Sequence, residues 1–290
     1  MLKRVIVGVL VILAAGCSRS SDDLIKDLYS TNSRTRMMAA SKLMLQSGDR
    51  EVVEKLIDIL DDGDDQVTFI ATQILGSLAD TLAVEPLGKL LDHPNPDIRA
   101  RACWSLGSLG HYSAFDYILT ALKDDNDNVR YSAVVALGHL HYTPSIQHIF
   151  PMFYDPVDSV RVRAIQSVYY YRLEEGAKIL SADFAPVMND RSDRVRYVAV
   201  QALGGAWEDA RGWVYADSTV AGELLVESLS DKNKFVRIEA INSLKKLHYK
   251  DAVPVLKQMY DLASVDEEVA ISEAVRDISG EDFPAMDSTE

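Results

Sequence analysis

The chain has 290 residues, 48% of them hydrophobic and 26% charged, with a formal net charge of −14. This composition predicts a folded protein and excludes a largely disordered chain. The negative charge opposes binding to DNA or RNA, and no run of Lys and Arg longer than a pair is present to overcome that repulsion.

The first 17 residues combine a short basic start, an apolar run of nine residues and the ending Ala14-Ala15-Gly16-Cys17. This pattern is typical of a secretory signal, and the apolar run is shorter than the roughly 20 residues of a membrane-spanning helix. The ending resembles a bacterial lipobox, although Ala14 stands where that family usually has Leu. The resemblance implies removal of residues 1–16 and a lipid on Cys17. An ordinary cleaved signal with a chance cysteine is the alternative.

The residue after the cysteine is Ser18. In enterobacterial lipoproteins a residue other than Asp at this place favours sorting to the outer membrane. The resemblance therefore implies a location in the bacterial cell envelope, at the outer membrane facing the periplasm rather than at the inner membrane or the cell surface. Residues 17–22 are expected to be the lipidated N-terminus and a short polar linker.

One sequence motif recurs throughout residues 23–280. Val129–Gly138 has close copies at Ile98–Gly107 and Val195–Gly204, and weaker copies elsewhere. The position held by Arg130 recurs at intervals of 31 to 41 residues, at 36, 68, 99, 130, 161, 196, 237 and 271. A period of this length predicts stacked supersecondary repeats instead of one globular core.

Each repeat is expected to contain two helices. In the fourth repeat, residues 113–122 have apolar side chains at the spacing of one helical face. Residues 123–126 interrupt this pattern, and Asp127 is predicted to cap a second helix that runs to about Leu140. The interruption recurs as Asp-x-x-Asp-x-Val, and no stretch shows the alternation of a strand. The fold class predicted is all-α.

The pattern Asp-x-x-Asp-x-Val-Arg-x-x-Ala-x-x-x-Leu-Gly, followed by a helix with an early proline, resembles the HEAT repeat, in particular the short bacterial class named after the phycobilisome lyases. The resemblance implies an α-α superhelix, a solenoid of about eight two-helix repeats. It also implies a ladder of Asp–Arg ion pairs that would stabilise the stack. By position these pairs are Asp127 with Arg130, Asp158 with Arg161, and Asp193 with Arg196. The ladder should lapse where Thr68 and Ile271 replace the arginine.

No catalytic constellation is found in the sequence. Cys103 lies at a core-facing position and is interpreted as a small buried hydrophobe. His111, His141 and His248 each precede a tyrosine in the turn between repeats, where a structural role explains their recurrence better than a metal site. The His-Glu dipeptides of the deoxyhypusine hydroxylases, which resemble HEAT arrays, are absent. We therefore expect no enzyme activity, no metal and no cofactor.

In each second helix, the position two residues after the repeated Ala faces away from the buried side of the helix. Stacked repeats align these positions in a column. It is largely uncharged and rich in amides, and the resemblance to HEAT arrays implies that it lines the concave side. The candidates for partner binding in this column are Gln73, Trp104, Val135, Gln166, Gln201 and Asn242, with Ser41 at its start. Arg101 and Arg163 lie beside it and would suit an acidic partner. An ordinary solvated face is the alternative.

Two repeats are longer than the rest. The larger insertion follows Gly204 and contains Trp207 and Trp213. Insertions in repeat proteins lie in loops on one face, often the binding face, so these residues are further candidates for binding a partner. The alternative is that both rings pack back over the edge of a repeat. Residues 281–290 are expected to form a flexible acidic tail.

These observations favour a non-catalytic scaffold or adaptor. It would be anchored to a membrane by its N-terminal lipid, would be monomeric, and would bind a protein or peptide along its helical face. The first alternative is an enzyme or enzyme-accessory protein of the lyase-like HEAT class. The second is a cell-envelope assembly factor.

Overall fold

The computed structural model describes residues 19–140, 142–174, 181–205 and 218–283. These residues form α-helices joined by short turns and 3₁₀ segments, and none of them is in a strand. The prediction of an all-α fold is confirmed. The chain divides into two compact units, Met1–Ala121 and Leu122–Glu290, which are described separately here as the N-terminal unit and the C-terminal unit.

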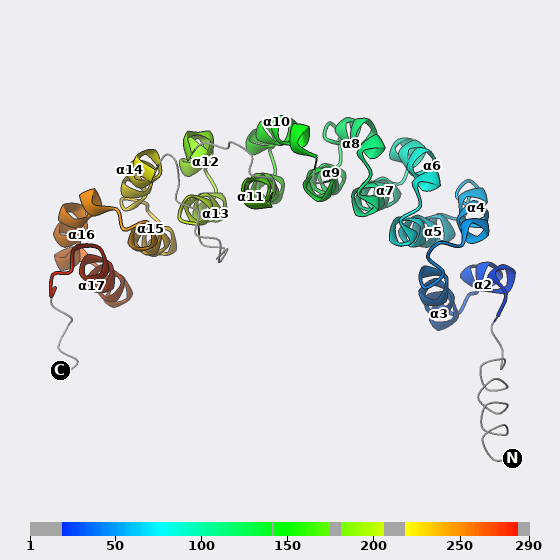
Figure 1. The fold of residues 1–290 in the computed structure, drawn as a ribbon, viewed down its shortest axis with the longest axis horizontal. Helices are drawn as coiled ribbons and strands as arrows, with labels where there is room; N and C mark the ends of the chain where they lie inside the picture. The colour runs from blue at the N-terminus through cyan, green and yellow to red at the C-terminus, as the bar shows by residue number, and fades with distance from the viewer. Residues whose placement is uncertain (1–18, 141, 175–180, 206–217, 284–290) are drawn as a thin grey trace, which may run out of the picture. The chain divides into compact units, whose positions relative to one another are not determined.

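The N-terminal unit contains three complete helix pairs and the first helix of a fourth. Its α-helices are α2 (Ser21–Leu28), α3 (Ser33–Met44), α4 (Arg50–Asp58), α5 (Asp65–Leu78), α6 (Val84–Lys89), α7 (Pro96–Leu109) and α8 (Phe115–Ala121), with 3₁₀ segments at Thr81–Ala83, Leu90–Asp92 and Tyr112–Ala114. The second helices α3, α5 and α7 form one layer, and α4, α6 and α8 form the other (Figure 1). Helix α2 starts at Ser21, two residues before the predicted start of the repeats at residue 23.

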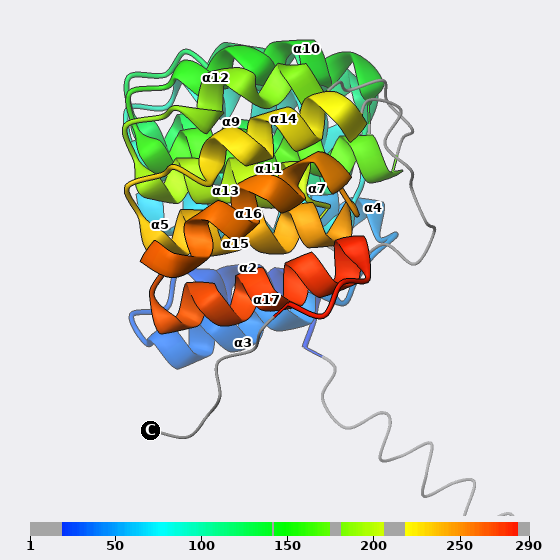
Figure 2. The ribbon, with the colours of Figure 1, turned by 90° about the vertical axis from the view of Figure 1, so that its left-hand side faces the viewer.

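The C-terminal unit continues the same order. Its α-helices are α9 (Asp127–His139), α10 (Ile146–Ile149), α11 (Asp158–Glu174), α12 (Ala185–Met188), α13 (Asp193–Leu203), α14 (Ser218–Ser228), α15 (Lys234–Lys246), α16 (Val253–Met259) and α17 (Val265–Ser279), with 3₁₀ segments at Thr143–Ser145, Phe150–Tyr154, Ser181–Phe184, Lys250–Ala252 and Tyr260–Leu262. Helices α13, α15 and α17 run side by side (Figure 2). In chain order the described residues form 16 α-helices, the number predicted for eight two-helix repeats.

The core of each unit lies between its two helix layers, and the residues predicted to face the core are buried. In α9, Val129, Ala133 and Leu137 are fully buried, and their counterparts Ile98, Ala102 and Leu106 in α7 are equally buried. Cys103 is also fully buried. Burying one such apolar face per helix is what stabilises a stack whose single repeats have no complete core of their own.

The helix caps lie one residue earlier than predicted. Asn126, not Asp127, is the N-cap of α9, and its side chain accepts hydrogen bonds from the N–H groups of Asn128 and Val129. Asp127 is the first residue of the helix, where its negative charge still suits the helix dipole. Helix α5 behaves in the same way, because Asp64 caps it and Asp65 begins it.

The arginine ladder exists in the C-terminal unit, but the expected pairs are wrong. Arg130 forms a bidentate pair with Asp155, at 2.7 and 3.0 Å, and not with Asp127. Arg161 pairs in the same way with Asp190, and Arg196 with Asp231, so Asp158 and Asp193 are not the partners. Each arginine therefore uses the acid at the first position of the Asp-x-x-Asp pattern in the next repeat, and after Asp231 the second position is held by Lys234. Residues three apart on a helix are neighbours, but the stacked repeat places the Asp155 carboxylate 2.7 Å from the Arg130 Nε atom, and this bidentate contact is the one that forms.

The same arginines also bind their own repeat. The Nη1 atoms of Arg130, Arg161 and Arg196 donate to the carbonyl oxygen six residues earlier, at 2.9, 2.7 and 2.8 Å. Arg237 follows this rule with Asp231 and pairs with Glu267 across to α17. At the position where the ladder should lapse, Thr68 donates its hydroxyl to the carbonyl of Leu60 instead. The ladder thus ties turn to turn along the C-terminal unit.

Candidate functional site: a groove on the second helices

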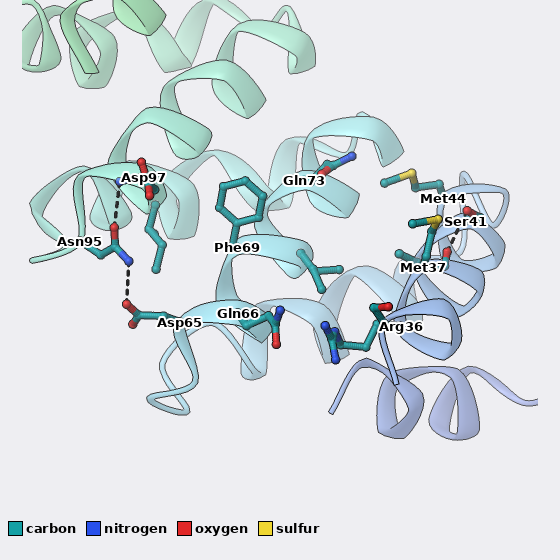
Figure 3. A pocket seen from close by; sticks show the side chains of 14 residues that line it. Arg36, Met37, Ser41, Met44, Asp65, Gln66, Phe69, Gln73, Asn95 and Asp97 are labelled. Carbon is teal, nitrogen blue, oxygen red and sulfur yellow. Dashed lines mark hydrogen bonds between the residues drawn. The ribbon is translucent and has the colours of Figure 1, made fainter. Parts of the chain in front are cut away.

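A groove of about 740 Å³ lies on the second-helix layer of the N-terminal unit. Its walls come from α3, α5 and α7 and from the turn before α7 (Figure 3). The residues that line it are Ser33, Arg36, Met37, Ala40, Ser41, Met44, Asp65, Gln66, Phe69, Ile70, Gln73, Asn95, Asp97 and Ile98. We call this set the α3–α5–α7 groove. It contains Gln73, which the sequence singled out, and Ser41 from the same column.

The floor of the groove is apolar. Phe69 lies at its centre, with Met37 and Met44 on the α3 side (Figure 3). Met37 is 69% exposed, and its neighbour Met38 is 53% exposed. Methionine side chains are flexible and polarizable, so they adapt to partners of different shape. Met37 and Met44 were not predicted from the sequence, because they lie in the first repeat, where the repeated motif is poorly matched.

Polar groups surround this floor. Asp65 accepts a hydrogen bond from the Asn95 side chain at 2.7 Å, which joins the N-terminal ends of α5 and α7. On the opposite side, Arg36 donates to the carbonyl of Ser30 at 2.6 Å. Gln73 is exposed at the other end of the α5 wall. The groove therefore offers an apolar floor with acids, amides and Arg36 at its rim, which is the composition of a site for a peptide or protein segment.

Arg101 lies beside the groove, one turn after Asp97 and Ile98. Its guanidinium carbon is 4.5 Å from the centre of the Phe69 ring, a cation–π contact. The Nε atom is buried and has no hydrogen-bond partner among the described residues. Burial lowers the pKa of the Arg101 guanidinium from its ordinary value. Trp104, one turn further along α7, is 43% exposed.

The column continues differently in the C-terminal unit. Gln166, Gln201 and Asn242 are only half-exposed. Gln201 donates to the hydroxyl of Tyr197 at 3.1 Å, and this hydroxyl donates to Glu239 at 3.1 Å. Burial first, and then the charge of Glu239, raise the pKa of Tyr197 above its ordinary value. These polar groups already hydrogen-bond to one another. They are therefore less available to a partner than the groups that line the groove.

Val135 was expected on the exposed column, and the structure corrects this. Its side chain is only 5% exposed, within a run of buried residues from Ala133 to Leu137. A helix with five consecutive buried residues is covered on more than one face, so the position opposite the core phase is also enclosed. Val135 is not available to a partner.

Three sequence candidates lie outside the described residues. These are Cys17, the expected lipid attachment site, and the two tryptophans of the insertion, Trp207 and Trp213. Of the candidate binding surfaces, the groove and the column of second-helix positions lie within the described residues. Among the helices described, none is long and apolar enough to cross a membrane.

His111, in the turn between two repeats, caps the 3₁₀ segment that follows it. The Nδ1 atom of His111 lies 2.7 Å from the Ser113 hydroxyl and accepts the Ser113 N–H. His93 accepts the N–H of Asn95 at 3.1 Å in the same way. In both residues the ring nitrogen accepts a backbone N–H two residues later. Within the described residues, no three His, Cys, Asp or Glu side chains gather where they could hold a metal ion.

Comparison with known proteins agrees with this architecture. Residues 84–168 and 182–275 match the family model of HEAT repeats. The chain belongs to the HEAT-repeat family. Its arginine ladder and paired helices are thus features of a HEAT array. A comparison with curated proteins gives no match.

Several solved structures are similar to this HEAT-repeat chain. YibA of Escherichia coli is 19% identical, with a TM-score of 0.62 over 91% of this chain and 93% of that one. The complex of CpcE and CpcF of phycocyanin lyase from Nostoc sp. PCC7120 is 20% identical, with a TM-score of 0.46 over 91% and 96%. Human deoxyhypusine hydroxylase in complex with glycerol is 16% identical, with a TM-score of 0.40 over 90% and 96%. At this level of identity, the likeness to YibA shows the fold alone.

Proposed function

We propose that this HEAT-repeat protein is a non-catalytic scaffold or adaptor that binds a protein or peptide partner in the α3–α5–α7 groove. We propose further that a lipid on Cys17 anchors it to a bacterial membrane, with the outer membrane facing the periplasm as the favoured location. The observation that carries the binding proposal is the groove itself, an apolar floor left open on the second-helix layer.

The exposed methionines support a partner rather than a solvated face. A soluble surface tolerates single exposed apolar side chains, but a contiguous apolar hollow with a polar rim is typical of an interaction site. Met37 and Phe69 lie in one such hollow, with Asp65 and Gln73 at its edges. An amphipathic segment would bury its apolar face there and leave its polar face in water.

Site-specific crosslinking tests the groove. A photo-reactive residue placed at Gln73, in the groove, should capture one partner in stoichiometric yield from intact cells. The matched control carries the same residue at Glu85, which is exposed on α6 in the other layer of the same unit. Adding Met37→Glu should abolish the crosslink from Gln73, because a carboxylate on the apolar floor opposes burial of an apolar segment. Met37 is largely exposed, so this change leaves the fold intact.

Two results would contradict the proposal. Equal crosslinking from Gln73 and Glu85 would mean that the groove is not a preferred surface. A crosslink from Gln73 that survives Met37→Glu would mean that the apolar floor does not hold the partner. Stoichiometric iron or a coloured group in the purified protein would speak for the enzyme alternative instead.

The membrane proposal has its own experiment. Cys17→Ser should abolish labelling with radioactive palmitate and release the protein from the membrane fraction, because the sequence offers the thiol of Cys17 as the lipid acceptor. Cys103→Ser is the matched control, since Cys103 is buried in α7. Retained membrane association of the Cys17→Ser chain would count against the lipid anchor.

A further inference from the structure

An aromatic side chain faces a charged side chain at three equivalent places in the array. Each place joins two neighbouring second helices, with the aromatic residue two positions after the first core residue of its helix. The three pairs are Phe69 of α5 with Arg101 of α7, Tyr131 of α9 with Arg163 of α11, and Tyr197 of α13 with Glu239 of α15. The array thus provides its own internal comparison.

In the C-terminal unit both pairs satisfy their polar groups. The Nε atom of Arg163 donates to the Tyr131 hydroxyl at 3.0 Å, with the guanidinium carbon 5.1 Å from the ring centre. In the third pair the charge is reversed, and the Tyr197 hydroxyl donates to Glu239. The aromatic hydroxyl is the internal partner in both pairs.

In the N-terminal unit this partner is missing. Phe69 has no hydroxyl, and the Nε atom of Arg101 is buried without an acceptor. Asp97 is four residues earlier on the same helix, a spacing that favours ion pairs, yet no ion pair of Arg101 occurs among the described residues. A buried donor on a charged group is costly to leave unsatisfied, so a carboxylate from a partner that reached the Arg101 guanidinium would relieve this cost.

We propose that Arg101 binds a carboxylate of the partner, one that belongs to a peptide segment whose apolar side chains fill the α3–α5–α7 groove. This inference rests on the proposed function and specifies the chemistry of the partner. A guanidinium binds a carboxylate through two parallel N–H bonds, and the face of Phe69 holds it in place for that geometry. Arg101 lies beside the groove wall, so one short segment reaches both.

The neighbouring charges limit the partner further. Asp97 lies one turn from Arg101, and Asp65 lies at the same end of the groove. Both repel additional acids, in a chain whose net charge is −14. The segment that fits carries a single acid next to apolar residues, not a run of acids.

Display of random 12-residue peptides tests this proposal without knowledge of the natural partner. The bait is the chain from residue 18 to 290, which retains every described helix. The wild-type chain should enrich peptides with one Asp or Glu flanked by large apolar residues. For one such synthetic peptide, Arg101→Gln should weaken binding at least about tenfold, the order expected for loss of one member of a buried charge pair. Arg163→Gln, at the pair with an internal partner, should change binding less than about twofold.

A second variant guards against loss of fold. Phe69→Tyr gives Arg101 the internal hydroxyl that Arg163 already has, and it should weaken binding of the acidic peptide while preserving helix content by circular dichroism. Apolar peptides without an acid, bound equally by wild type and Arg101→Gln, would overturn the role of Arg101 and leave the groove as a docking site. If no peptide is enriched, the docking site itself is wrong and the inference fails with it.

Discussion

At the scale of single residues, buried arginines stabilise this array by joining successive repeats. Arg196 illustrates the arrangement, because it binds the carbonyl of Asp190 in its own repeat and the carboxylate of Asp231 in the next. The two side chains of this pair are only 6% and 9% exposed. Removing one member would leave the other charge buried and without a partner.

Asp231→Asn should therefore lower the free energy of unfolding by about 3–5 kcal/mol. The measurement is urea denaturation followed by circular dichroism. Glu85→Gln is the matched control, because its ion pair with Lys89 is exposed and such pairs contribute about 0.5 kcal/mol or less. Equal effects of the two substitutions would show that the ladder contributes no more than a surface pair.

The acids of the ladder also make stability depend on pH. Burial by itself would raise the pKa of Glu267, but hydrogen bonds from Arg237 and Ser264 outweigh it and lower the pKa to about 2. The pKa of Asp231 is likewise lowered by Arg196 and by the Asn233 N–H, against the effect of burial. A carboxyl whose pKa is lower in the folded state stabilises the fold above its ordinary pKa, and this contribution is lost as the pH falls.

We expect the free energy of unfolding to fall as the pH is lowered from about 5 to about 2, with Glu267 contributing up to about 3 kcal/mol. Glu267→Gln should be less stable than wild type at pH 7 and should show a flatter dependence in this acid range. Denaturation curves at several pH values measure both quantities. A parallel decline in wild type and variant would mean that Glu267 does not titrate in this way.

At the scale of helices, glycine sets how closely neighbouring second helices approach. Gly76 lies within α5, and a Cβ atom there would be 2.7 Å from the Ser105 Oγ and 2.8 Å from its Cα. The hydroxyl of Ser105 donates to the carbonyl of Thr72 at 2.8 Å across this contact. Gly76 is thus a packing residue inside α5.

Gly76→Ala should destabilise the protein by about 1–3 kcal/mol, because the clash outweighs the gain in helix propensity. Gly138→Ala is the matched control. Its Cβ would meet the Ser167 Oγ at 3.1 Å, the end of a side chain that can rotate. Thermal denaturation should rank Gly76→Ala well below Gly138→Ala. The reverse order would show that the α5–α7 contact is looser than the geometry indicates.

At the scale of the whole molecule, the two units differ at one arginine position and in how many residues helices α3 and α13 bury. The ladder runs through the C-terminal unit from Arg130 to Glu267. In the N-terminal unit, Arg36 and Arg99 also donate to the carbonyl six residues earlier, but Thr68 stands at the arginine position of the second repeat. Helix α3 buries only Ala39 and Leu43, whereas seven residues of α13 are buried. Local opening is easiest where the fewest apolar groups are buried.

Hydrogen exchange should therefore be faster in α3 than in α13 under native conditions. Mass spectrometry of peptides covering the two helices measures the difference, and α17 offers a comparison, since it is a terminal helix with seven buried residues. Slow exchange in α3, equal to that in α13, would show that helix burial does not determine local opening here. A more mobile wall is consistent with a groove that adapts to its partner.

The sequence alone determined the all-α fold, the eight helix pairs and the buried phase of Val129, Ala133 and Leu137. It did so because each helix must bury one apolar face, and the apolar residues of that face recur about every 3.6 residues within each repeat. The expectations for Cys17, Trp207 and Trp213 stay predictions, since these residues lie outside the described part of the chain.

Only the tertiary structure decided which side chains meet. Arg130 has an acid nearby on its own helix, Asp127, and another in the next repeat, Asp155, and the spatial stacking of repeats, not their spacing in the sequence, selected Asp155. The same holds for exposure. Val135 and Gln73 occupy equivalent positions, yet neighbouring packing buries the valine and leaves the glutamine on the wall of a groove. Packing between repeats depends on the residues of both neighbours, so the sequence motif of one repeat does not predict it.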